Sequence, residues 1–273
     1  MTTTSLRMRL IWLALIAVVP LIILIAITIN DQFQHHKEQG EESITRLAQS
    51  VSIQQDQYIE ATHQLLVAVA QLPEVVNRNA QTCNRYATGL LSQYPKYANL
   101  GAIAMNGDIF CSGLEMEGTV NAADRSYFQG AVEQNDFAIG NYQIGRITGQ
   151  ASLNFGYPAR DDDGTTTAIV FAALKLDWIA DYATRIDLPE QGELTLVDRG
   201  GTILARYPNP EEWIGEELAE EGLFAQMTSL QEDIVEATDA QGTERFYAFA
   251  PLSREAEGAY VVVSIPKHIV FAD

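Results

Sequence analysis

The chain has 273 residues and a formal net charge of −19 at pH 7. All 36 acidic residues and 15 of the 17 basic ones lie beyond Asn30, which gives that part a charge of −21 by difference. Such a surface repels nucleic acid and anionic lipid, so we exclude nucleic-acid binding, and the length allows one or two folded domains.

The N-terminal segment predicts the compartment. Residues Leu10–Ile29 form an uncharged run of 20 residues, long enough for a helix to cross a bilayer. Arg7 and Arg9 precede it, so we expect residues 1–9 to stay in the cytoplasm and the rest to be exported. A cleaved signal peptide is the alternative, but the run is long for one and has no Ala-x-Ala site at its end. Both interpretations place residues 31–273 outside the cytoplasm, and we expect an inner-membrane protein with a single anchor.

A long helix is expected over residues 30–72, which contain one glycine and no proline. Its apolar positions recur every seven residues, at Ile44, Val51, Tyr58, Leu65 and Leu72. A heptad period favours a stalk that pairs with a second copy of the chain, whereas the alternative is a helix packed on its own domain. We expect both on different parts of the helix, and therefore a homodimer.

Beyond Pro73 the pattern changes to short apolar runs separated by turn residues, which indicates mixed α and β structure. We expect helices over 83–93, 122–134, 177–186 and 211–231, and strands over 100–105, 109–112, 138–147, 151–157, 167–176, 193–198, 202–205, 234–238, 244–251 and 259–265. Asn106-Gly107-Asp108 predicts a hairpin turn, and Arg199-Gly200-Gly201 repeats that arrangement. The repeat favours two similar units in tandem, at 73–191 and 192–273.

Cys83 and Cys111 are the two cysteines. In an exported domain such a pair predicts a disulfide, and two buried free thiols are the alternative.

In this order the elements resemble a double Cache sensor domain, a tandem of two PAS-like units found outside the membrane in bacterial receptors. The resemblance covers residues 31–273. Local phrases carry it, namely Tyr97-Ala98-Asn99-Leu100, Asn106-Gly107-Asp108, Cys111-Ser112, Asp124-Arg125-Ser126-Tyr127-Phe128 and Asn154-Phe155-Gly156-Tyr157-Pro158-Ala159. It implies an α+β fold in which 73–191 is a membrane-distal, ligand-binding unit and 192–273 a membrane-proximal one.

The resemblance also implies a ligand site. Amino-acid-sensing members have Arg, any residue, two aromatics, two residues and Ala, and the segment Arg125–Ala131 fits this pattern. It implies ligand contacts for Arg125, Tyr127 and Phe128, and for a later Tyr and Asp that correspond to Tyr142 and Asp177. The chain departs from the pattern at Val120, where those members have Tyr, and this puts an amino-acid ligand in doubt.

The residue chemistry agrees with such a site. The planar guanidinium of Arg125 matches a carboxylate in two-pronged fashion, and Asp177 could accept hydrogen bonds from an ammonium group. The alternative is that Arg125 pairs with Asp124 at the surface and that the aromatic residues belong to the core.

Catalytic and metal motifs are missing from the sequence, so we expect no enzyme activity in this chain, no cofactor and no metal site. Residues 207–244 hold 11 acids and no Lys or Arg, which leaves a divalent-cation sensor open as an alternative. Asp161-Asp162-Asp163-Gly164 lacks EF-hand spacing and predicts a turn.

The sequence therefore predicts the small-molecule sensing domain of a transmembrane receptor, whose ligand is an amino acid, a carboxylate or a similar molecule. A ligand-free ectodomain that binds a periplasmic protein is the alternative from another class. Because a receptor of this family would continue into a second membrane helix and an output module, we expect the chain to be a fragment or truncated product.

Overall fold

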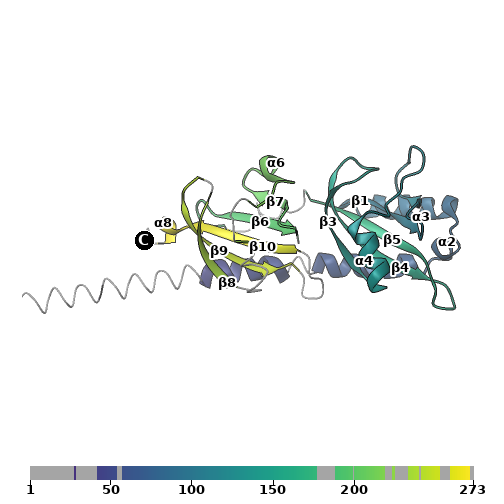
Figure 1. Ribbon diagram of the computed structural model, residues 1–273, viewed down its shortest axis with the longest axis horizontal. Coiled ribbons are helices and arrows are strands. Elements are labelled where there is room, and N and C mark those ends of the chain that lie inside the picture. Colours follow the sequence, from purple (N-terminus) through teal and green to yellow (C-terminus); the bar gives the residue numbers. More distant parts are fainter. Residues whose placement is uncertain are drawn as a thin grey trace, which may run out of the picture.

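The structure is a computed structural model that describes residues 28, 42–53, 57–176, 188–198, 200–218, 223–224, 233–239, 241–252 and 259–270. Two antiparallel five-stranded sheets lie one after the other along the helical residues 42–53 and 57–70, which we together call the long helix (Figure 1). We call the part that carries the first sheet the first unit and the part that carries the second sheet the second unit. The expected α+β class with two antiparallel sheets is confirmed.

The first unit consists of one sheet with helices on both faces. Its helices are α2 (Pro73–Val76), α3 (Ala80–Gln93) and α4 (Ser126–Gln134). Its strands are β1 (Tyr97–Ala104), β2 (Ile109–Ser112), β3 (Ala138–Ile144), β4 (Ala151–Arg160) and β5 (Thr166–Lys175), in the spatial order β2-β1-β5-β4-β3. In Figure 1, α4 lies in front of the sheet, while α3 lies behind it.

The second unit repeats this topology. Its strands are β6 (Glu193–Asp198), β7 (Ile203–Tyr207), β8 (Asp233–Thr238), β9 (Glu244–Pro251) and β10 (Ala259–Pro266), in the order β7-β6-β10-β9-β8. Two short helices accompany them, α6 (Pro210–Trp213) and α8 (Lys267–Val270). If the strands of each unit are numbered one to five, both sheets have the order 2-1-5-4-3, so the tandem inferred from two hairpin turns is a repeat of the whole sheet.

Residues 42–53 and 57–70 are helical, and their buried face packs on both sheets. The buried positions follow an eleven-residue period, because Ala48, Val51 and Ile59 have buried counterparts at Ile59, Thr62 and Ala70. An eleven-residue repeat, 3.67 residues per turn, suits a nearly straight helix, whereas a seven-residue line drifts around it. The expected heptad line therefore leaves the buried face, and Tyr58 is 37% exposed.

Several element ends differ from the sequence-based ranges for local reasons. The helix expected from 122 begins at Ser126, because Asn121 accepts from the Ala123 amide and Arg125 is the N-cap. Strand β4 continues past Pro158, which pairs with Ile169 of β5. The helix expected over 211–231 is wrong for residues 214–218, where Gly215 takes a φ of +92° after α6. The helix expected over 177–186 lies outside the described residues.

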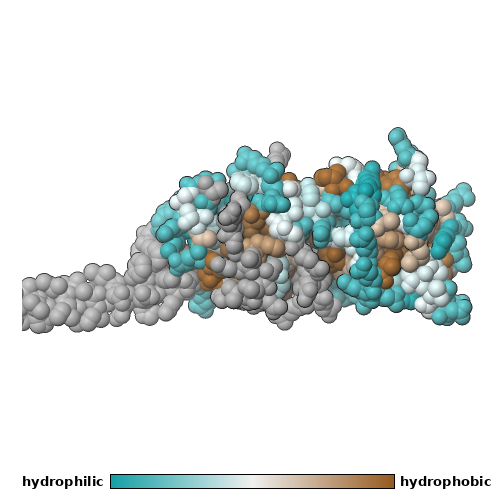
Figure 2. All heavy atoms as spheres, viewed as in Figure 1, coloured by the Kyte–Doolittle hydropathy of each residue, from teal (hydrophilic) through white to brown (hydrophobic). Residues whose placement is uncertain are grey.

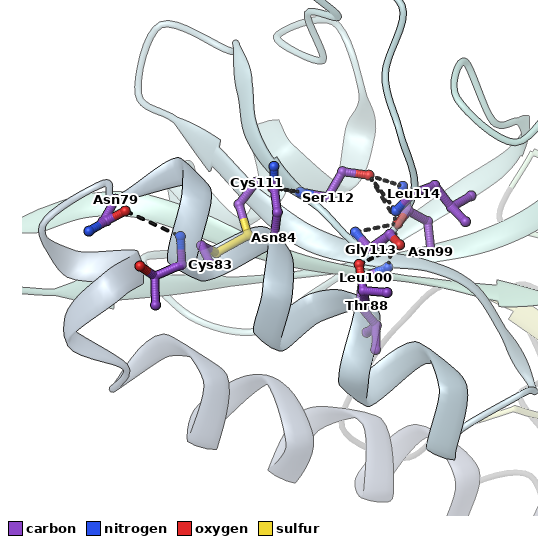
Figure 3. Close-up of a disulfide and its surroundings, with 11 residues drawn as sticks. Asn79, Cys83, Asn84, Thr88, Asn99, Leu100, Cys111, Ser112, Gly113 and Leu114 are labelled. Atoms are coloured by element: carbon purple, nitrogen blue, oxygen red, sulfur yellow. Dashed lines mark hydrogen bonds between the residues drawn. A yellow bond between two sulfur atoms is a disulfide. The ribbon is translucent and has the colours of Figure 1, made fainter.

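A disulfide joins Cys83 of α3 to Cys111 of β2, which confirms the expected pair (Figure 3). Both cysteines are buried, and neighbouring hydrogen bonds hold the same two elements together. The Ser112 amide donates to Asn84 Oδ1 at 2.9 Å, and Thr88 Oγ1 donates to the Gly113 carbonyl at 3.0 Å. The two cysteines are separated by 28 positions in the sequence. On the chain-entropy model, a crosslink that closes a loop of this length stabilises the fold by roughly 3–4 kcal/mol.

On the face seen in Figure 2, the hydrophobic residues of the described part are scattered among hydrophilic ones. Within the described residues, no helix combines the length and the apolar character that crossing a membrane requires. The predicted membrane helix at 10–29 lies outside the described residues, apart from Thr28.

Candidate functional site

A pocket of about 360 Å³, open mouth included, lies on the face of the first sheet that α4 covers. Three parts of the first unit enclose it: the sheet, the start of α4 with the loop before it, and the β3–β4 hairpin. Among the lining residues are Asn99, Asn154, Phe171 and Ala173 from the sheet, Val120, Arg125 and Tyr127 from the second part, and Gln143, Gly145, Arg146, Ile147 and Thr148 from the hairpin.

Arg125 is placed at the pocket by the start of α4. It is the N-cap residue, and its carbonyl accepts from the amides of Phe128 and Gln129, both at 3.0 Å. Its half-buried side chain turns towards the β3–β4 hairpin, where Nη2 donates to the Ile144 carbonyl at 3.3 Å. Among the described residues, no carboxylate forms an ion pair with Arg125. The predicted alternative, a surface pair with Asp124, is therefore not what the structure shows.

The two aromatic residues that follow Arg125 lie in different environments. Tyr127 is buried and lines the pocket, and burial, opposed by a hydrogen bond with the Asn154 side chain, raises the pKa of its phenol to about 12. The hydroxyl is therefore neutral at physiological pH. Phe128 is buried in the apolar cluster beside the pocket and is not among its lining residues. One turn on, Ala131 must be small, because α4 comes so near the sheet that a Cβ on Gly156 would lie 3.1 Å from the Ala131 Cβ.

Arg146 brings a second guanidinium to the pocket, and the sequence analysis did not single it out. It forms a two-pronged ion pair with Asp124, in which Nη1–Oδ1 and Nη2–Oδ2 are both 2.7 Å apart. The hydrogen bonds from Arg146 hold the pKa of the Asp124 carboxyl at about 2. Asp124 thus neutralises Arg146 and fastens the β3–β4 hairpin beside the mouth of the pocket, while Arg125 has no carboxylate partner in the described part of the chain.

Tyr142 lies between the two units and is not among the residues that line this pocket. Its amide donates to the Asp198 carboxylate of β6, with N and Oδ2 2.9 Å apart, and a Cβ on Gly215 would lie 2.9 Å from its hydroxyl. The adjacent Gln143 lines the pocket, so the strand that carries Tyr142 connects the pocket to the second unit.

Two other expectations lie wholly or largely outside the described residues. Asp177 follows the last described residue of its segment, Leu176, just beyond β5. Much of the acidic stretch 207–244 is also not described, and within the described part of the chain no three His, Cys, Asp or Glu side chains are grouped as a metal site would require.

Sequence reasoning missed Asn99, Asn154 and Arg146. The two asparagines lie in strands, where both are buried, at 2% and 4% exposure. A buried Asn within an apolar strand is a usable signal, because such a side chain requires hydrogen-bond partners. Asn99 Oδ1 accepts from the amides of Leu100 and Gly113, and Asn154 Oδ1 accepts from Ser152 Oγ.

Two sheets of one topology, packed on the helical residues 42–53 and 57–70 and with a pocket on the first sheet, define a tandem PAS-like module. The model of the Cache domain in its dCache_1 form matches residues 31–273, and the chain belongs to this family. Cache domains are extracytoplasmic sensor domains of membrane receptors and are not themselves catalytic.

Solved structures share the fold. The extracellular domain of the putative histidine kinase rpHK1S-Z16 aligns with a TM-score of 0.68 at 18% identity, over 86% of this chain and 98% of that one. The ligand-binding domain of the Pseudomonas fluorescens chemoreceptor CtaA, in complex with L-isoleucine, aligns with a TM-score of 0.67 at 17% identity, over 88% of this chain and 98% of that one.

A curated relative, sporulation kinase D of Bacillus subtilis (strain 168), is 32% identical over 85 residues. The match covers 31% of this chain and 17% of that protein, so the chain corresponds to a small part of the kinase.

Proposed function

We propose that the first unit binds a small carboxylate, with α-amino acids as the leading class, and that the chain is the sensing domain of a transmembrane receptor. The observation that carries this proposal is that Arg125 lines the pocket and has no carboxylate partner among the residues that the structure describes. A guanidinium binds a carboxylate through two parallel charge-assisted hydrogen bonds.

The rest of the pocket is consistent with a small anionic or zwitterionic ligand. Its lining includes two arginines and neutral polar side chains, with no Asp or Glu among the described lining residues. Tyr127 and Phe171 add apolar surface and, from Tyr127, a neutral hydroxyl. In place of the family's Tyr, Val120 lines the pocket, so this chain lacks one hydroxyl that amino-acid-sensing members have.

Two further residues belong to the proposal. We assign Asp177, which comes four residues after the lining residue Ala173, to the ammonium group of an amino acid. Tyr142 remains a predicted ligand residue, although its ring lies at Gly215. The fold of CtaA, solved with L-isoleucine, supports amino acids as the first ligands to try.

A thermal-shift screen of the purified 273-residue chain tests the proposal. The screen includes amino acids, small carboxylates, amines and divalent cations. A ligand at 100 times its Kd stabilises the chain by about 2.7 kcal/mol, which is visible as a raised melting temperature. We expect a carboxylate or amino-acid hit that is lost in Arg125→Ala and kept in Arg85→Ala, which removes an exposed arginine of α3.

A hit confined to divalent cations and unchanged in Arg125→Ala would contradict the proposal and favour the acidic stretch. A flat screen of folded protein would favour a ligand-free ectodomain that binds another protein.

The proposed receptor has residues 10–29 as its membrane anchor and works as a homodimer. The exposed side of the long helix supports the dimer, because Ile53 is 59% exposed although it is a large apolar residue. Ligand binding would act by shifting the population between two arrangements of the paired helices.

A further inference from the structure

The two sheets can be aligned residue by residue, because each has a bulge at the same place. The β1–β2 ladder shifts register between Ala102 and Ile103, and the β6–β7 ladder shifts between Leu196 and Val197. Aligning the two bulges makes Asn99, three residues before Ala102, equivalent to Glu193, three residues before Leu196.

The cross-strand pairs extend this alignment to the other strands of the two sheets. In the first sheet, Ala173 pairs with Asn99 on one side and Asn154 on the other. In the second sheet, Ser264 occupies the corresponding place on the central strand. It pairs with Glu193 and Tyr247. Since Asn99, Asn154 and Ala173 all line the pocket of the first unit, their counterparts mark the equivalent place in the second unit.

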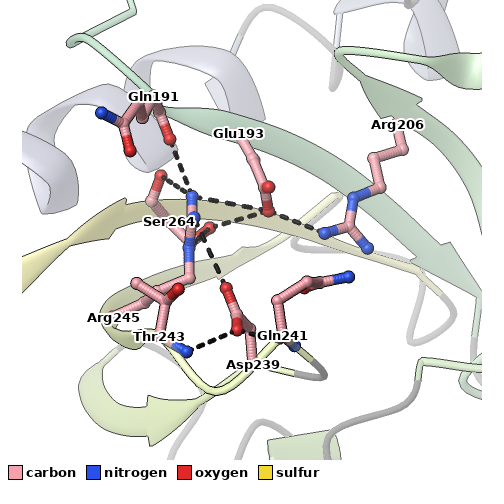
Figure 4. A network of polar contacts seen from close by, with 8 residues as sticks. All are labelled: Gln191, Glu193, Arg206, Asp239, Gln241, Thr243, Arg245 and Ser264. Atoms are coloured by element: carbon pink, nitrogen blue, oxygen red, sulfur yellow. Dashed lines mark hydrogen bonds and ion pairs between the residues drawn. The ribbon is translucent and has the colours of Figure 1, made fainter.

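In the second unit, the carboxylate of Glu193 lies at this equivalent place. Glu193 Oε2 lies 2.7 Å from Arg206 Nη2 and 3.5 Å from Arg245 Nη2. Ser264 Oγ donates to the same oxygen at 3.4 Å. The four residues come from four different strands, β6, β7, β9 and β10, and their side chains converge as Figure 4 shows.

The two arginines are held in place by further contacts. Arg245, whose side chain is 6% exposed, also donates to the Gln191 carbonyl at 2.9 Å and lies 3.7 Å from Asp239 Oδ2. Arg206, 10% exposed, lies over the Trp213 ring at 4.3 Å. Buried guanidinium groups that are fixed in this way form a ready anion site, since a charge buried without a partner is costly.

We infer that the second unit contains a carboxylate-binding site that is permanently filled by Glu193. The second unit is thus a self-liganded copy of the first. Glu193 takes the position that a free carboxylate would take, which leaves the first unit to respond to molecules from outside. The inference rests on the second unit's own residues and holds whatever ligand the first unit binds.

Chemical rescue of the full chain tests the inference. Glu193→Ala removes a CH₂–COO⁻ fragment, which has the size of acetate, and leaves Arg206 without its carboxylate. We expect the melting temperature to fall by roughly 5–10 °C. Sodium acetate at tens of millimolar should recover at least half of this loss, whereas sodium chloride at equal ionic strength should not.

Two variants serve as matched controls. Glu193→Gln fills the cavity without the charge and should gain nothing specific from acetate. Glu244→Ala removes the 71% exposed partner of Lys267 and should leave both the melting temperature and the acetate response as in the wild type. An equal acetate response in wild type and Glu193→Ala, or an unaltered melting temperature in Glu193→Ala, would overturn the inference.

If Glu193→Ala does not fold, a double-mutant cycle with Glu193→Gln and Arg206→Met replaces the rescue. We expect the unfolding equilibrium constants of the wild type, the two single variants and the double variant to give at least a fivefold coupling. Additive effects would refute the filled site, and no readout in either experiment involves the ligand of the first unit.

Discussion

Asp124 and Arg125 are neighbours in the sequence, but their side chains have different partners at the pocket. The Asp124 carboxylate neutralises Arg146 of the β3–β4 hairpin through two hydrogen bonds of 2.7 Å, whereas the Arg125 side chain donates to the Ile144 carbonyl and has no carboxylate partner within the described part of the chain. A single carboxylate therefore decides which of two arginines remains available for a ligand. This division of charge could not be derived from the Arg-x-aromatic-aromatic pattern alone, because Arg146 comes from a distant hairpin.

The Asp124–Arg146 pair makes a pH-dependent contribution to stability. The Asp124 pKa is depressed to about 2 from 3.8, so its contribution is fully present above pH 3.8 and is lost as the pH falls towards 2. We expect Asp124→Asn to melt below the wild type at pH 6, and the difference to shrink at pH 3. The difference will be small, since the two side chains are 61% and 42% exposed.

Asp163→Asn changes a carboxylate in an exposed turn and is the control. Its melting temperature should equal that of the wild type at both pH values. A gap between Asp124→Asn and wild type that widened on acidification would contradict the assignment.

At the scale of elements, the long helix shows how far periodicity alone can go. Its helical nature was predictable from residues 30–72, but the face that it buries was not. Ile44 and Val51 are buried as the heptad predicts, whereas Tyr58 on the same line is 37% exposed. Thr62, on the adjoining line of the stripe, is buried, and its hydroxyl lies 2.8 Å from the Tyr97 hydroxyl, a partner that the sequence pattern does not specify.

The proposed dimer can be tested on this helix by cysteine crosslinking in membranes. The two native cysteines are bonded to each other, so a single introduced cysteine is the sole free thiol. We expect Ile53→Cys to form a crosslinked dimer under mild oxidation, because Ile53 is 59% exposed and lies on the opposite side of the helix from the buried Val51.

Val51→Cys is the matched control, since Val51 is 3% exposed and packs on the chain's own core. Equal crosslinking at positions 51 and 53, or none at 53, would contradict a dimer through the exposed face.

At the scale of the whole molecule, the two units meet at Asp198. This residue is 2% exposed, and Oδ2 accepts from the Tyr142 amide of the first unit. Oδ1 accepts from the amides of Gly200 and Thr202 in the β6–β7 turn, at 2.8 and 2.9 Å. One carboxylate thus joins the strand that leads into the pocket hairpin to the second unit.

We expect Asp198→Ala to destabilise the chain by about 3 kcal/mol, because it leaves several amides without their charged acceptor. We also expect the wild type to unfold in a single calorimetric transition and Asp198→Ala to unfold in two. Asp163→Ala should keep the wild-type transition. A single transition for Asp198→Ala at the wild-type temperature would show that the units are coupled elsewhere.

The fold was largely predictable from the sequence, because hairpin turns and apolar strands are local signals. Strands β2, β6 and β9 match their expected ranges, and the turn at Asn106-Gly107-Asp108 joins β1 to β2. The candidate site was predictable only in part, namely at Arg125 and Tyr127. The remaining pocket residues are brought together by pairing between distant strands, which a single sequence does not specify.

Calorimetric titration of a carboxylate ligand and its carboxamide analogue tests the central claim most directly. The carboxylate hit of the screen and the analogue, which has the same shape but no negative charge, are each titrated into wild type and Arg125→Ala. We predict that the wild type binds the carboxylate at least tenfold more tightly, about 1.4 kcal/mol, and that Arg125→Ala loses this preference. Equal affinities for the two ligands in the wild type, or a preference that survives in Arg125→Ala, would contradict carboxylate recognition by Arg125.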